Sequence, residues 1–508
     1  MFKNRKLFKA IPLCLAVVFI AAMFAACGAG NKLNKASKAV NNYKIVCEYD
    51  DGAKTVAGAY ELSYINNTEV PLNELKLHLY GNAYREKAKY PAVSDGKERR
   101  EAAYPDGPSW GDIKVSNVKL NGKAATAAVG GEDEDILTVA FDKPLYPTAR
   151  YKVSMDFKLK LANIMHRLGY NANTVNLGNW YPIACVYENG GFCAEPYYTN
   201  GDPFYSDIAN YEVTMTVPSP FLIASTGEIQ KSSENGGKTT YTMKARAVRD
   251  FAMALGDKFQ TVAGKAGKTT VTYYYYGDKT PDASLKAAVD SLTAFNALFG
   301  VYPYKTLAVA RTGFIHGGME YPNLVYVSDA ESMSYEYYQE VIIHEVAHQW
   351  WYGVVGNNQI KDAWMDEGFA DYSATLFYEK HPGYNQTRGD RIMQTMKEYL
   401  VFTDIIKTYM QKDKTLDTSM NRPLDQYNTE SEYVYMTYGK GQLLFDNLRN
   451  TIGDKAFFEG LQTYYSRNMF KNAKQENMIG AFEAASGKDL EGYFNAWIKG
   501  TVLITDLY

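Results

Sequence analysis

Hydrophobic and polar residues alternate along the first half of the chain. The alternation is clearest over residues 151–161, where every second position is apolar, and it recurs over residues 75–79 and 211–217. A period of two residues is typical of strands that bury one face, and the Asn-Gly pair at residues 121–122 favours a hairpin turn. We therefore predict that residues 43–265 form a domain of antiparallel β-strands.

The pattern changes to helical spacing in the second half of the chain, residues 266–508. Residues 285–299 are the first segment with apolar side chains three or four positions apart, and the same stripe returns at residues 441–450, 455–466 and 477–485. This spacing places the apolar side chains on one face of a helix. The chain is therefore predicted to be an α+β protein with a β-domain followed by a mainly helical domain.

The first 27 residues resemble a bacterial lipoprotein signal. Basic residues precede an apolar run, residues 10–26, which ends in small side chains directly before Cys27. This arrangement predicts lipidation at Cys27. The alternative is an uncleaved anchor, because an apolar run of this length lies at the lower limit for spanning a bilayer. Residues 28–42 are small and polar without periodicity, so we expect a flexible tether there.

Composition limits the class of partner. The net charge is −3, and the 22% of charged residues include both signs, so the chain lacks the basic surface that nucleic acid requires. Only three of the five cysteines follow residue 27, too few for a disulfide framework. Cys185 and Cys193 either form a disulfide or remain free thiols. Nothing in the sequence indicates the oligomeric state.

The strongest chemical signal is the pattern His-Glu-x-x-His at residues 344–348. His344 and His348 are four positions apart, so on a helix both can present an imidazole nitrogen to one metal ion. Glu345 can act as a general base toward a water at that metal. Glu367, on a second predicted helix, supplies a third ligand. Two imidazoles and one carboxylate leave a coordination position open, which predicts one catalytic zinc ion.

Asp371 follows Glu367 by four residues and should share its helix face. We expect Asp371 to accept a hydrogen bond from the second ring nitrogen of one of the two histidines, as carboxylates near zinc commonly do. The alternative is that Asp371 only solvates the helix surface.

These segments together resemble the aminopeptidase N family of zinc metallopeptidases, the gluzincin aminopeptidases, which include leukotriene hydrolase. HEVAHQWW at residues 344–351 and WMDEGFADY at residues 364–372 are similar to the family's zinc signature. GGMEYP at residues 317–322 is similar to its G-x-M-E-N exopeptidase motif, and YGKG at residues 438–441 to its Y-x-K-G motif. The signal segment suggests a short member of bacterial lipoprotein type.

The resemblance implies a fold and an oxyanion donor. The β-domain is expected to be the family's saddle-like N-terminal domain, and the second domain its thermolysin-like catalytic domain. Tyr438 matches the tyrosine that stabilises the oxyanion of the tetrahedral intermediate, a role for which a neutral phenol is suited. Tyr433 and Tyr435 lie close by and are its rivals.

The resemblance also implies how the substrate is bound. Glu320 is expected to bind the α-ammonium group of the substrate, which would make the enzyme an exopeptidase. The substrate is expected to lie along Gly317, Gly318 and Met319. Tyr321 replaces the asparagine that usually follows the glutamate. Many members add a second amine-binding side chain from the N-terminal domain, but no acidic residue occurs near residues 180–182, where we expect it.

The leading hypothesis is a zinc aminopeptidase that removes N-terminal residues from peptides and is lipid-anchored on the outer face of the cell membrane. An endopeptidase or an epoxide hydrolase of the same fold is one alternative. A non-catalytic surface-binding lipoprotein is another, although a binding module has no need of a general base.

Overall fold

The computed structural model describes residues 28–502 and 504, except residues 95, 331–332 and 411–416. The predicted signal segment, including Cys27, lies outside the described residues. Among the helices that the structure describes, none has both the length and the apolar character needed to cross a bilayer.

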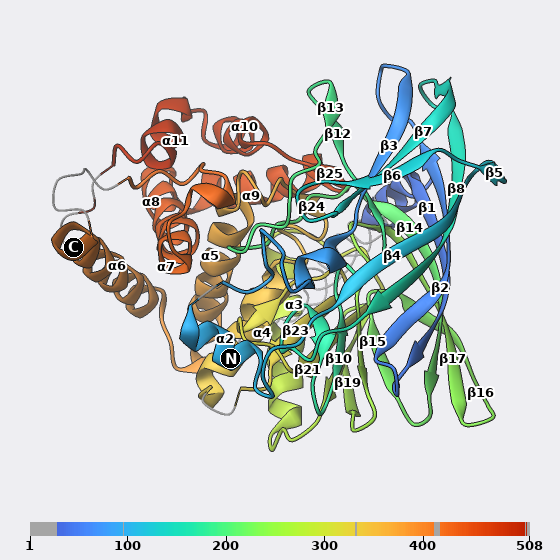
Figure 1. Ribbon diagram of the computed structural model, residues 1–508. Helices are drawn as coiled ribbons and strands as arrows, with labels where there is room; N and C mark the ends of the chain where they lie inside the picture. Colours follow the sequence, from blue (N-terminus) through green and yellow to red (C-terminus); the bar gives the residue numbers. More distant parts are fainter. Residues whose placement is uncertain (1–27, 95, 331–332, 411–416, 503, 505–508) are drawn as a thin grey trace, which may run out of the picture.

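The N-terminal domain is built around an eight-stranded sheet, on the right in Figure 1. Its strands, in spatial order, are β16 (Glu228–Asn235), β17 (Lys238–Val248), β14 (Ala209–Pro218), β1 (Asn41–Asp50), β2 (Thr55–Ile65), β8 (Arg150–Lys160), β4 (Asp112–Leu120) and β5 (Lys123–Ala124). Burial alternates along β1 and β14, as a period of two predicts. These two strands pair in parallel, so the sheet is mixed and not wholly antiparallel as we expected.

Two four-stranded sheets complete the β-domain. One contains β15 (Leu222–Ser225), β18 (Met253–Gly256), β10 (Val175–Leu177) and β9 (Leu168–Tyr170), and the other β11 (Ile183–Ala184), β3 (Leu72–His78), β7 (Ile136–Leu145) and β6 (Ala127–Gly130). Their buried side chains join those of the large sheet in one hydrophobic core. The hairpin of β12 (Tyr187–Glu188) and β13 (Gly191–Phe192) lies between Cys185 and Cys193, which are both free thiols.

The second domain, for which we keep the expected name catalytic domain, begins with a five-stranded sheet. In spatial order its strands are β19 (Gln260–Ala266), β20 (Thr269–Tyr275), β21 (Thr306–Thr312), β23 (Leu324–Ser328) and β22 (Gly318–Met319). The boundary that we placed after residue 265 falls inside β19. That strand forms a hairpin with β20 around Gly267, so it belongs to the second domain although its sequence continues the β pattern of the first.

Helices make up most of the catalytic domain (Figure 1). They are α3 (Pro281–Leu298), α4 (Tyr335–Ala347), α5 (Trp364–Lys380), α6 (Arg388–Ile405), α7 (Glu430–Val434), α8 (Lys440–Ile452), α9 (Asp454–Asn468), α10 (Gln475–Ser486) and α11 (Glu491–Ile498). Helix α5 is buried on nearly all sides, so it forms the centre of the domain. It crosses α8 at a pair of glycines, because a Cβ atom on Gly368 would lie 2.9 Å from the Cα atom of Gly441.

The predicted tether is folded in the structure. Residues 28–36 form a helix, and β1 begins at Asn41. Ala29 and Leu33, one turn apart, are buried, and Lys32 Nζ donates a hydrogen bond to Ser466 O over 2.6 Å. Two small apolar contacts are enough to dock a short helix on a surface that already exists, whereas they are too few to give a periodic signal in the sequence.

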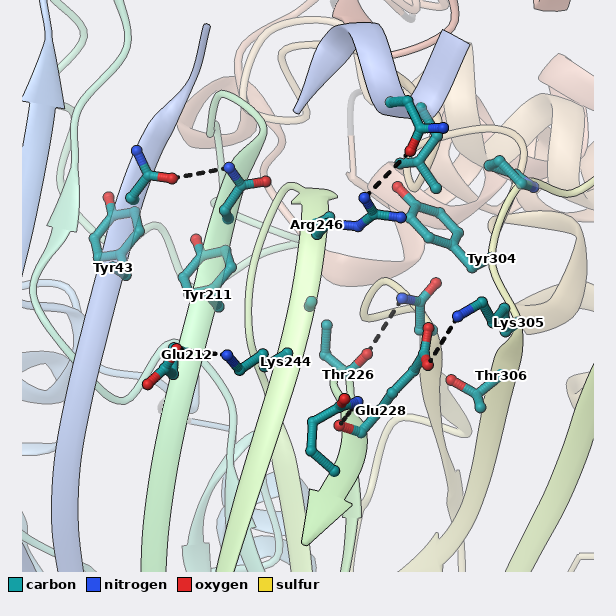
Figure 2. Close-up of a pocket in the computed structure, with 18 of the residues that line it drawn as sticks. Tyr43, Tyr211, Glu212, Thr226, Glu228, Lys244, Arg246, Tyr304, Lys305 and Thr306 are labelled. Atoms are coloured by element: carbon teal, nitrogen blue, oxygen red, sulfur yellow. Dashed lines mark hydrogen bonds and ion pairs between the residues drawn. The ribbon is translucent and has the colours of Figure 1, made fainter. Parts of the chain in front are cut away.

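This helix forms part of the wall of an open pocket of about 620 Å³ (Figure 2). The pocket also borders the eight-stranded sheet and residues 303–306 of the catalytic domain. Charged side chains across it pair with each other: Lys244 with Glu212 at 2.8 Å, and Lys305 with Glu228 at 3.6 Å. The pocket shares no lining residue with the site described below.

A buried arginine joins the two domains. Arg249, which follows β17, donates to Ser206 O at 3.1 Å in its own domain, and to Tyr352 O at 2.7 Å and Lys471 O at 2.5 Å in the catalytic domain. Tyr352 has a φ of 112°, a region that side chains other than glycine rarely adopt. Gly356 is required beside it, because a Cβ atom there would overlap the guanidinium group.

Gly356→Ala should therefore destabilise the protein by about 1–3 kcal/mol, the usual cost of overpacking a buried site. Gly480→Ala is the control, because a Cβ atom at this position in α10 meets no atom within 4 Å and alanine favours a helix. Thermal unfolding of both variants tests this. Equal midpoints for Gly356→Ala and wild type would show that Arg249 has room to move.

Candidate active site

Three side chains from two helices converge on one point. His344 lies in the last turn of α4, His348 caps that helix, and Glu367 lies in the first turn of α5. The Nε2 atoms of the two histidines are 3.0 Å apart, and Glu367 Oε2 is 3.1 Å from His348 Nε2 and 3.4 Å from His344 Nε2. Two imidazole nitrogens and one carboxylate oxygen could therefore hold a single metal ion.

The outer nitrogens of both imidazoles are also engaged. His344 Nδ1 donates to Asp371 Oδ1 at 2.8 Å, the contact that the helical spacing predicted. His348 Nδ1 donates to Trp351 O at 3.0 Å. Because each Nδ1–H is held by an acceptor, each Nε2 is left to face the common point, which is the usual arrangement around zinc. The residues present thus fit a zinc ion.

Electrostatics favours an ionised Glu367. Burial alone would raise its pKa, but the His348 imidazole and hydrogen bonds from both histidines hold the pKa well below its usual value. Its position in the first turn of α5 adds the favourable field of the helix dipole. A carboxylate that stays charged when buried is suited to bind a cation.

Glu345 lies between the two histidines and faces the same pocket. Burial raises the pKa of its carboxyl group to about 7, against the opposite effect of both imidazoles. Its Oε2 atom is buried without a hydrogen-bond partner. Gly318 makes room for it, because a Cβ atom there would overlap Oε1. An unpaired buried carboxylate costs stability, so its presence indicates a chemical role.

Glu320 follows β22, and its carboxyl group bonds to a residue that we did not single out from the sequence. Its Oε1 atom accepts a hydrogen bond from Gln359 Nε2 at 2.8 Å, and the same amide nitrogen donates to Asp366 Oδ2 at 2.7 Å. Burial and the nearby charge of Asp202 raise the pKa of Glu320 well above its usual value. Gln359 lies in a polar loop without any motif that distinguishes it.

The N-terminal domain contributes an acidic residue to the pocket, Asp202, which we did not single out from the sequence. It lies about twenty residues after the segment 180–182, is buried, and lines the same pocket as Glu320. Arg167 NH2 donates to Asp202 Oδ1 at 2.5 Å. The Nε atom of Arg167 contacts Met319 Sδ at 3.1 Å, so the Met319 side chain packs against the N-terminal domain and does not line the pocket.

Tyr438 lies in the π-helix η5 (Tyr435–Gly439), between α7 and α8. Its hydroxyl donates to Glu367 Oε1 at 2.6 Å, and its ring stacks on that of His344. Of the three candidate tyrosines it is the one that lines the pocket. The hydroxyl of Tyr433 is buried without a partner, and the ring of Tyr435 stacks on α6.

The pocket enclosed by these residues has a volume of about 140 Å³. Most residues singled out from the sequence line it: His344, Glu345, His348, Glu367, Asp371, Glu320, Gly317, Gly318 and Tyr438. His316 also lines it, with Nε2 lying 3.0 Å from His166 Nε2. None of its lining residues is a lysine or an arginine, whereas six are acidic.

Comparison with known proteins agrees with this geometry. Residues 283–497 match the peptidase family M1 domain. The chain is 28% identical over 178 residues to aminopeptidase N of Streptomyces lividans, covering 34% of this chain and 20% of that protein. It is 23% identical over 405 residues to aminopeptidase M1-C of Oryza sativa subsp. japonica, covering 76% of this chain and 44% of that protein. The chain thus spans less than half the length of these relatives.

Solved structures show the same fold. The M1 zinc metallopeptidase from Deinococcus radiodurans has a TM-score of 0.64 at 18% identity, and the match covers 92% of this chain and 94% of that one. A variant of the Deinococcus enzyme bound to a Tyr-Ser-Ala substrate matches equally well, with a TM-score of 0.64 at 18% identity and the same coverage. The two-domain architecture is therefore that of an M1 metallopeptidase.

Metal content tests the convergence of the three ligand atoms. His344→Ala, His348→Ala and Glu367→Ala should each lose bound zinc, because two remaining donors hold the ion weakly. His381→Ala is the control, since His381 Nδ1 bonds to Phe377 O outside the pocket. Elemental analysis after dialysis gives the zinc-to-protein ratio. Full zinc content in any of the three ligand variants would mean that the ion binds elsewhere.

Proposed function

Because the chain belongs to peptidase family M1, the aminopeptidase N family of zinc metallopeptidases, we propose that it is a zinc aminopeptidase that removes N-terminal residues from peptides. One observation carries the proposal. The three converging donor atoms, the unpartnered carboxylate of Glu345 and the carboxylate of Glu320 share one small pocket. Removal of an N-terminal residue needs a metal site, a general base, and an anionic group that binds the substrate's ammonium group.

His344, His348 and Glu367 would hold one zinc ion. When bound there, zinc polarises the scissile carbonyl group and makes a water molecule more acidic. Glu345 takes the proton of the attacking water through its free Oε2 atom and passes it to the leaving amine. Asp371 keeps the ring of His344 in the orientation that binding requires.

Tyr438 would donate a hydrogen bond to the oxyanion that forms when water attacks. Burial and the charge of Glu367 raise the pKa of its hydroxyl well above the usual value, so the phenol stays neutral and can donate. Its contact with Glu367 Oε1 places the hydroxyl at the edge of the ligand cluster. The positions of Tyr433 and Tyr435 outside the pocket lining favour Tyr438 over both rivals.

Glu320 would bind the α-ammonium group of the substrate, with Asp202 as a second carboxylate from the N-terminal domain. Both line the pocket, and Gln359 and Arg167 hold them in place. The substrate backbone would pass along Gly317 and Gly318. Two carboxylates that bind a free α-ammonium group would fix the scissile bond one residue away, which favours an exopeptidase over an endopeptidase.

The sequence supports a membrane location, which we propose as well. The apolar run of residues 10–26 ends directly before Cys27, so lipidation there would anchor the protein on the outer face of the cell membrane. The helix of residues 28–36 is docked on the folded domains, so such an anchor would hold them close to the bilayer.

The intact mass of the mature protein tests the anchor. Lipidation predicts the mass of residues 27–508 plus the lipid, and Cys27→Ser should abolish this species. A mass corresponding to the entire unprocessed chain would instead favour the uncleaved helix.

Paired substrates test the activity. A zinc-loaded preparation should hydrolyse aminoacyl reporters with a free amino group and leave their N-acetylated twins almost untouched, because acetylation removes the charge that Glu320 binds. Glu345→Gln should keep its zinc and lower kcat by on the order of 10²–10⁴. Equal rates on both twins would favour the endopeptidase alternative. Absence of turnover in a folded, zinc-loaded protein would favour a binding role.

A further inference from the structure

Tyr321 occupies the position directly after Glu320 and reaches into the other domain. Its side chain is completely buried, and its hydroxyl donates to Asn179 Oδ1 at 3.0 Å, just beyond β10. The amide nitrogen Nδ2 of Asn179 donates in turn to Asp250 Oδ2 at 2.7 Å. Asp250 Oδ1 accepts from the hydroxyl of Tyr181 at 2.9 Å. The hydroxyl of Tyr321 is thus one end of a hydrogen-bonded chain inside the N-terminal domain.

The receiving loop is shaped for this hydroxyl. A Cβ atom at Gly178 would overlap the Tyr321 hydroxyl oxygen, so a side chain at that position would exclude it. Asn179 has a φ of 51°, in the left-handed region that asparagine tolerates better than most residues. Tyr321, Gly178 and Asn179 therefore fit each other across the domain junction.

The backbone of Tyr321 is held from the opposite side. Its carbonyl oxygen accepts from Gln349 Nε2 at 3.2 Å, and Gln349 follows the metal-site residue His348. The Oε1 atom of Gln349 accepts from Asn323 N at 2.8 Å. Tyr321 is therefore fixed both to the segment that carries the metal ligands and to the N-terminal domain.

The backbone here needs these contacts because β22 itself is held by few hydrogen bonds. It consists of two residues at the edge of the sheet and pairs with β23 through Gly318 and Met319 alone. A two-residue edge strand gains few ladder hydrogen bonds. Gln359 holds the side chain of Glu320, and the backbone of Glu320, immediately beyond that strand, is held in addition by what fixes Tyr321.

We propose that Tyr321 is a positioning residue for Glu320, and that its hydroxyl bond to Asn179 determines how tightly the enzyme binds the ammonium group of a substrate. The inference rests on the proposed aminopeptidase function. Glu345 lies on α4, so its backbone is held by that helix and not by the hydroxyl bond of Tyr321. Loss of the Tyr321 hydroxyl should therefore weaken amine recognition and leave the hydrolytic step nearly intact.

Tyr321→Phe removes only the hydroxyl. It should raise KM for free aminoacyl reporters roughly 2- to 10-fold, as loss of one hydrogen bond predicts, with kcat little changed. The ratio of kcat/KM between free and N-acetylated reporters should fall by the same factor. Binding of a free amino acid to the zinc-loaded protein, measured by calorimetry, should weaken in parallel.

Tyr326→Phe is the matched control. Tyr326 is also completely buried, lies 5.2 Å from Tyr321 by ring centroids, and donates to Met253 O in the N-terminal domain at 2.6 Å. It should lower the thermal midpoint about as much as Tyr321→Phe and leave the free-to-acetylated ratio unchanged. If both variants changed that ratio equally, the effect of Tyr321 would be general stability and the proposal would fail.

A double-mutant cycle provides a second measurement. Asn179→Gly keeps the left-handed backbone and removes both the acceptor of the Tyr321 hydroxyl and the donor to Asp250. It should reproduce the effect of Tyr321→Phe on KM, and the double variant should show little further change in KM. Additive effects on KM would contradict the coupling. Wild-type protein that does not discriminate the acetylated twins would overturn the proposed function itself. A free-to-acetylated ratio in Tyr321→Phe equal to that of wild type would overturn the positioning role alone.

Discussion

The structure depends on keeping several carboxylates together in a very small space. Glu320, Glu345, Glu367 and Asp202 border one pocket of about 140 Å³, where like charges repel strongly because all four side chains are buried. Each carboxylate therefore needs a hydrogen-bond or ion-pair partner. Imidazole groups contact Glu367, an amide donates to Glu320, and a guanidinium group donates to Asp202. Glu345 has no hydrogen-bond partner for one of its oxygens.

These hydrogen-bond and ion-pair partners come from both domains, so the β-domain is part of the site. Arg167 brings the charge that Asp202 requires, and Arg249 holds the backbone of Tyr352, next to the carbonyl group of Trp351 that orients His348. A buried arginine that donates to carbonyl groups in two domains resists displacement, because separation would leave several polar groups without partners. The junction is accordingly rigid where the metal site is closest to it.

Local periodicity predicted the parts of the site that lie on single helices. Spacings of four residues placed His344 beside His348 and Asp371 near His344, as the structure shows. The residues that were missed, Asp202 and Gln359, meet Glu320 through contacts between segments far apart in the sequence, which no spacing reveals.

The alternating pattern of a strand also does not reveal a residue that lies on the polar side and is nevertheless buried. His78 falls on the polar side of the alternating pattern over residues 75–79. In the structure it is nevertheless buried, and its ring stacks on that of Tyr80. The helix of residues 28–36 escaped prediction for a related reason, since its stability comes from the surface on which it docks.

The glycine crossing of α5 and α8 sets the spacing between two parts of the site. Gly368 follows Glu367, and Gly441 lies three residues after Tyr438, so one backbone contact determines the spacing between the metal ligand and the tyrosine. A side chain at either glycine would push both groups apart at once. The site therefore depends on two glycines that do not line its pocket.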